Sequence, residues 1–77
     1  MPRVGEAFGI LFYVYAEDHN PPHVHAIAGS HEVTLVIATG AVLIGSLPGA
    51  KLRQAQEWLE LNRATVVAAW ERLNPAD

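Results

Sequence analysis

Apolar and polar residues alternate in short runs over the first half of the chain. Four of these runs are rich in β-branched and aromatic side chains and are bounded by polar residues, glycine or proline, as β-strands are. They lie at about residues 8–16, 23–28, 32–38 and 41–46. The links between them are short, which favours antiparallel neighbours, because parallel strands need long crossover connections. The pattern therefore predicts a four-stranded, mostly antiparallel meander.

After residue 46 the apolar residues recur at helical spacing, from Leu52 to Leu73. One helix over this whole segment would be about 37 Å long, which is more than such a small domain can cover. Asn62 is a suitable stop, so we predict helices at about 49–61 and 63–73. Packed on one face of the sheet, they complete a two-layer α+β fold, with residues 1–77 as a single domain.

Composition narrows the class of protein. Of the 77 residues, 51 % are hydrophobic and 17 % are charged, as in a folded domain. A domain of this size buries only about 60 % of the surface of its unfolded chain, so a metal ion or a partner would add needed stability. There is no cysteine, which excludes a disulfide and any thiolate ligand.

The net charge is −3, and the sequence shows no cluster of lysine and arginine that would form a basic face. Nucleic acid is therefore not expected as a direct partner. No apolar run approaches the roughly 20 residues of a membrane span, and no signal-peptide pattern is visible. These features lead us to expect a cytoplasmic protein without a membrane partner.

The chemistry of the chain is concentrated in residues 17–26, EDHNPPHVHA. His23 and His25 are two residues apart on a predicted strand, so their side chains leave the same face, roughly 6–7 Å apart. Asp18 and His19 precede them on a link that two prolines hold in a reproducible shape. A His₃ or His₂Asp set can bind a divalent ion such as zinc or nickel, so these four residues are the candidate metal ligands.

The same residues also fit other roles. His19, His23 and His25 are candidates for acid–base catalysis of phosphodiester cleavage without a metal. Alternatively, they are solvated residues at a strand edge, where the prolines end the pairing. His31, across the next turn, is a further histidine that could reach the same region, and it is not counted among the candidate ligands. Replacing His23 and His25 is expected to leave the metal-free fold largely intact, because neither strand alternation nor helix packing needs them.

The run FYVYAEDHNPPHVHA, the GSLP step at residues 45–48 and a tryptophan in each predicted helix resemble a known family. It consists of small bacterial proteins that carry a domain of unknown function with the motif Asp-His-x-Pro-Pro-His-x-His. The resemblance covers about residues 8–72. The matching positions are Tyr15, Asp18, His19, Pro21, Pro22, His23, His25, Trp58 and Trp70. Members often have a histidine where this chain has Asn62, so that position is given no role here.

Members of the family are often encoded beside another small domain, in pairs that resemble toxin–antitoxin modules. The resemblance therefore implies a protein-interaction module, which binds a partner encoded nearby or a second copy in a homodimer. Its histidine segment would hold a ligand or a divalent metal, and no organic cofactor is expected. The alternative is a minimal histidine-dependent nuclease or phosphodiesterase, and a third option is a metal-stabilised structural domain. No lysine or arginine lies within residues 17–26, which favours binding over RNA cleavage.

Overall fold

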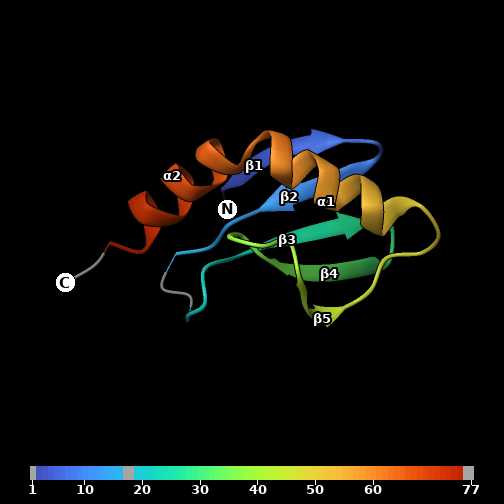
Figure 1. Cartoon of the computed structure of the whole chain (residues 1–77), viewed down its shortest axis with the longest axis horizontal. Coiled ribbons are helices and arrows are strands. Elements are labelled where there is room, and N and C mark those ends of the chain that lie inside the picture. Colours follow the sequence, from blue (N-terminus) through green and yellow to red (C-terminus); the bar gives the residue numbers. More distant parts are fainter. Residues whose placement is uncertain (1, 17–18, 76–77) are drawn as a thin grey trace.

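A five-stranded sheet followed by two helices makes up the computed structural model, which describes residues 2–16 and 19–75 (Figure 1). The strands are β1 (Arg3–Ala7), β2 (Ile10–Tyr13), β3 (His23–Ala28), β4 (His31–Val36) and β5 (Val42–Gly45), and the helices are α1 (Lys51–Leu61) and α2 (Arg63–Leu73). The strands lie in chain order, and each pairs antiparallel with the next. The predicted α+β class and the antiparallel meander are therefore confirmed.

The sheet has five strands, so the prediction of four was wrong. The additional strand, β1, has charged residues at two of its five positions and a glycine in the middle, so no apolar alternation marks it. Phe8 and Gly9 both have positive φ, 57° and 71°, and form the two-residue turn between β1 and β2. The strand predicted over residues 8–16 is therefore shorter, because its first two residues belong to this turn.

One face of the sheet and the two helices enclose the core. The buried sheet residues are Ile10, Phe12, Val14, Val24, Ala26, Ala28, Val33, Leu35 and Ile37, and the helices add Ala55, Leu59, Val66 and Trp70. Each large apolar side chain buried in this way contributes roughly 1.5–3 kcal/mol relative to an exposed one. Trp58 of α1 also stacks on Phe12 with ring centroids 3.9 Å apart. This packing places both helices on one face of the sheet, where Trp58 of α1 lies on Phe12 of β2 and α2 contacts β1. His25 and Glu32 leave the other face.

The two helices meet at Asn62, the residue at which the sequence predicted a break. Its side-chain amide donates to the carbonyl of Trp58 at 2.9 Å, which satisfies one of the last carbonyls of α1. α1 begins at Lys51, slightly later than predicted, and the Lys51 ammonium donates to the carbonyl of Phe8 in the β1–β2 turn. Within the described residues, no helix is both long and apolar enough to cross a membrane.

We predict that Gly45→Ala destabilises the fold more than Gly40→Ala does. The two glycines have nearly the same φ, 82° and 79°. A Cβ at Gly45 would lie 2.2 Å from the carbonyl oxygen of Glu32, whereas a Cβ at Gly40 meets nothing within 4 Å. The free energy of unfolding should therefore fall by only ~1–2 kcal/mol in the Gly40 variant, the cost of a left-handed backbone with a Cβ. In the Gly45 variant it should fall by more, because the added Cβ also meets the carbonyl of Glu32. Urea denaturation measures both values, and equal losses would contradict the close approach of β5 to β4.

Candidate functional site

Five ring-bearing side chains gather near the start of β3, and we call them the ring cluster: Tyr15, His19, His23, His25 and Trp70. The centroid of the His23 ring lies 5.4 Å from that of His19 and 5.1 Å from that of His25. Tyr15 packs edge-on to His25 at 4.7 Å, and Trp70 of α2 lies 5.2 Å from His23. The expected geometry, in which His23 and His25 share a face with His19 nearby, agrees with these distances.

His23 is the most deeply buried member of the cluster, with an exposed fraction of 3 %. Its Nδ1 lies 2.8 Å from the carbonyl oxygen of Pro21. A carbonyl only accepts hydrogen bonds, so Nδ1 carries the proton, and in the neutral ring Nε2 carries the lone pair. The next carbonyl, that of Pro22, accepts from the backbone N–H of Ile37 at 3.0 Å. Hydrogen bonds from β3 and from the residue after β4 therefore fix the double proline.

His25 is oriented by a carboxylate. Its Nδ1 lies 3.0 Å from Oε2 of Glu32 on β4, one strand away. An ionised carboxylate can only accept, so Nδ1 of His25 also carries the proton. The Nε2 atom of His25 is buried. In both rings Nδ1 is thus held by a protein acceptor, so a proton or a metal ion would be bound through Nε2.

One histidine considered from the sequence does not join this arrangement. His31 pairs with Ala28, at the far end of β3 from His23. The two ends of β3 are five positions apart, about 16 Å at a rise of 3.3 Å per residue, so His31 does not reach the ring cluster. Asp18 lies outside the described residues. Among the residues that the structure describes, no three His, Cys, Asp or Glu side chains are grouped closely enough to hold a metal ion.

Glu32 is the site residue that sequence reasoning missed. Its signal was the hairpin register: Ile27 pairs with Glu32 and His25 with Thr34, so Glu32 is a diagonal neighbour of His25 on the same face. The sequence analysis also predicted that the fold does not need His23. Its burial against Trp70 makes it part of the packing instead, because α2 covers the end of the sheet at which β3 begins.

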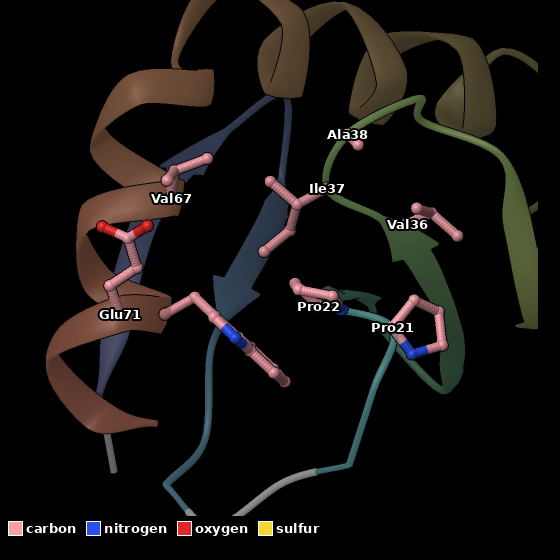
Figure 2. A pocket seen from close by; sticks show the side chains of 8 residues that line it. Pro21, Pro22, Val36, Ile37, Ala38, Val67 and Glu71 are labelled. Carbon is pink, nitrogen blue, oxygen red and sulfur yellow. The ribbon is translucent and has the colours of Figure 1, made fainter. Parts of the chain in front are cut away.

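A pocket of about 210 Å³ adjoins the ring cluster (Figure 2). Its lining residues are Pro21, Pro22, Val36, Ile37, Ala38, Val67, Trp70 and Glu71. Two of them also belong to the surroundings of His23: the carbonyl of Pro21 accepts its N–H, and the ring of Trp70 packs against it. The lining comes from three separate parts of the chain, so no local sequence pattern indicated this pocket.

We predict that His23→Phe lowers the free energy of unfolding by about 0.5–1.5 kcal/mol, the net worth of a typical hydrogen bond. Phenylalanine retains a ring to pack on Trp70 but has no N–H for the carbonyl of Pro21. The matched control is His31→Phe at an exposed position, where a change usually stays within about 0.5 kcal/mol. Thermal unfolding measures both variants. If His23→Phe is as stable as the control, the hydrogen bond to Pro21 does not stabilise the fold.

Comparison with known proteins identifies the family of the chain. Neither the curated proteins nor the solved structures give a match. A family model described as "Domain of unknown function (DUF4160)" matches residues 9–71, a range that includes the whole ring cluster and the residues that line the pocket. Because the match covers most of the chain, this protein belongs to the DUF4160 family.

Proposed function

We propose that this protein is a small binding module whose ring cluster takes a divalent metal ion, zinc or nickel. The observation that carries the proposal is the pair of hydrogen bonds that Nδ1–H donates in His23 and in His25. Histidines that bind a metal through one ring nitrogen almost always donate the other N–H to a backbone carbonyl or a carboxylate. Here Pro21 supplies the carbonyl and Glu32 the carboxylate, so both rings are oriented before any ion binds.

His19 is the third ligand of the proposed site. Its ring is exposed, it lies on the link before β3, and it already packs against His23. Metal–nitrogen distances are about 2.1 Å. Within the described residues no three such side chains are arranged to hold an ion, so binding requires the rings to turn toward a common point. Reorientation of the exposed His19 supplies that change, and Asp18, its neighbour in the chain, is the candidate oxygen ligand.

The module is proposed to work with a protein partner in the cytoplasm of a bacterium, as one half of a toxin–antitoxin-like pair. The resemblance carried by the Asp-His-x-Pro-Pro-His-x-His motif supports this context. The edge strand β5 supports a partner: Val42, Leu43 and Ile44 are 42 %, 42 % and 68 % exposed, and β5 has no charged residue. Proteins usually protect an edge strand with charges or proline, so an apolar edge suits pairing with another chain or with a second copy.

Metal should stabilise the folded protein. At about a hundredfold excess of zinc or nickel over the dissociation constant, we predict a gain of about 2.7 kcal/mol in the free energy of unfolding. The double variant His19→Ala/His25→Ala should lose this gain without losing the fold, because neither residue is fully buried. His31→Ala is the control and should retain the gain. Calorimetric melts with metal and with chelator measure it, and a chelator-insensitive melting temperature in the wild type would reject the metal site.

The metal-dependent gain should also depend on pH. Protons compete with the metal for the imidazole nitrogens, so binding requires neutral rings. We predict that the gain shrinks as the pH falls from about 8 to about 5, the range in which histidines change charge. Repeating the melts across this range tests the ligand type. A gain that stays constant would mean that imidazoles do not hold the ion.

A second candidate function is favoured by the His25–Glu32 pair beside His23. A carboxylate that holds an imidazole by Nδ1 also orients the general base of hydrolases, and a second imidazole can act as the acid. In a metal-free nuclease of this kind, His25→Ala would abolish cleavage of RNA or DNA, and chelation would leave cleavage unchanged. The melts and a cleavage assay on the same variants therefore separate the two functions.

A further inference from the structure

The pocket beside the ring cluster is a cavity that the proposed metal site does not use. We propose that it receives one apolar side chain of the protein partner, with a lysine or arginine of the partner next to that side chain in sequence. This inference rests on the proposed function, because it describes the chemistry of the protein partner proposed there. The site itself is distinct from the metal site, because none of the three histidines lines the pocket.

The walls of the pocket set the size and polarity of the occupant. Seven of its eight lining residues are apolar, and Figure 2 shows Val67, Ile37 and Pro22 among the side chains around the cavity. A dry cavity of about 150 Å³ is enough for a benzene ring, whereas drug-sized ligands occupy about 300–1,000 Å³. At about 210 Å³ this pocket holds one branched or aromatic side chain and little more.

The surface around the pocket indicates that this side chain belongs to a protein. On α2 the stretch between Arg63 and Glu71 has no charged residue, and Ala64, Val67 and Ala68 within it are exposed. A single apolar anchor in a pocket, surrounded by near-neutral contacts that exclude water, is the usual pattern of a protein interface. A free small molecule in an open pocket of this volume would keep much of its surface in water.

Glu71 gives the occupant its charge. Its side chain is exposed, and within the described part of the chain no hydrogen bond or ion pair engages its carboxylate. Glu71 follows Val67 by four residues, so both lie on one face of α2, as Figure 2 shows. The nearby Arg63 is engaged elsewhere, because its Nε donates to the carbonyl of Ile37 at 2.8 Å. A cation beside the apolar anchor therefore complements the carboxylate at the rim.

Trp70 supplies a direct readout of the pocket. Its indole lines the pocket, whereas Trp58 stacks on Phe12 in the core and does not. In an NMR titration of the chelator-treated protein, the indole N–H signal of Trp70 should shift saturably when the pocket fills. The signal of Trp58 should stay in place, so the protein contains its own control.

The probes are three peptides: N-acetyl-leucyl-lysine amide, N-acetyl-alanyl-lysine amide and N-acetyl-leucyl-glutamate amide. The first should bind most tightly. The alanyl peptide should bind at least about tenfold more weakly, because it loses the burial of the leucine side chain. The glutamate peptide should bind about two- to fivefold more weakly, as expected for the loss of an exposed ion pair. Equal responses to the leucyl and alanyl peptides, or no shift of Trp70, would overturn the proposal.

Two variants test the named residues. Val67→Lys, at an exposed position of α2, should weaken binding of the leucyl-lysine peptide at least about tenfold by placing a cation at the rim and removing an apolar wall. Glu71→Gln should erase the preference for lysine over glutamate in the peptide. The matched control is Glu60→Gln, an exposed glutamate on α1, which should retain the preference. A Glu71→Gln protein that still prefers lysine would show that Glu71 does not select the charge.

Two further measurements separate this proposal from its alternatives. If the Trp70 signal shifts with protein concentration in the absence of peptide, a second copy of the chain occupies the pocket, and the proposed partner is wrong. His25→Ala should bind the peptides as the wild type does. Peptide binding without any metal response would reject the metal site and leave the pocket standing, and a metal response without peptide binding would reject the pocket alone.

Discussion

The alternation of side chains along β3 is the constraint on which the fold and the candidate site both depend. Val24, Ala26 and Ala28 must face the helices, since they form the middle of the core. His23 and His25 are then forced to the opposite side of the same strand, and a slip of one residue would bury the imidazoles among the core side chains. The core and the histidine pair are thus two consequences of one register, which is fixed by pairing with β2 and β4.

Elements whose signal is local could be predicted from the sequence. β3 and the break between the helices follow from alternation and from Asn62, and both lie where the pattern places them. β1 carries no such signal, because its position in the sheet depends on long-range packing. Trp58 fills the space above Gly5, where an added Cβ would lie 2.1 Å from the indole ring. Glycine weakens an isolated strand, but in β1 the absence of a side chain at Gly5 is what allows Trp58 to pack against the strand.

In the candidate site, too, some features follow from local sequence spacing and others depend on tertiary packing. The spacing of His23 and His25 predicts their common face, and the rings are adjacent in the structure. Their hydrogen-bond acceptors could not be inferred as easily, since Glu32 requires the hairpin register and Pro21 requires the path of the link. The contact with Trp70, 47 residues further along than His23, depends on how α2 crosses the end of the sheet. Sequence spacing therefore predicts which rings meet, and tertiary packing decides which nitrogen each ring presents.

The surroundings of His23 and the pocket share two residues, Pro21 and Trp70, so binding at one site would affect the free energy of binding at the other. The Pro21 segment holds His23 through its carbonyl and forms one wall of the pocket, while Trp70 packs on His23 and forms another. If both proposed sites bind their ligands, a ligand that orders Pro21 or Trp70 at one site would leave less conformational entropy to be lost on binding at the other, and the two binding events would favour each other. Such coupling is reciprocal, so metal would strengthen partner binding by the same factor by which the partner strengthens metal binding. The two proposed sites would in this way act as one.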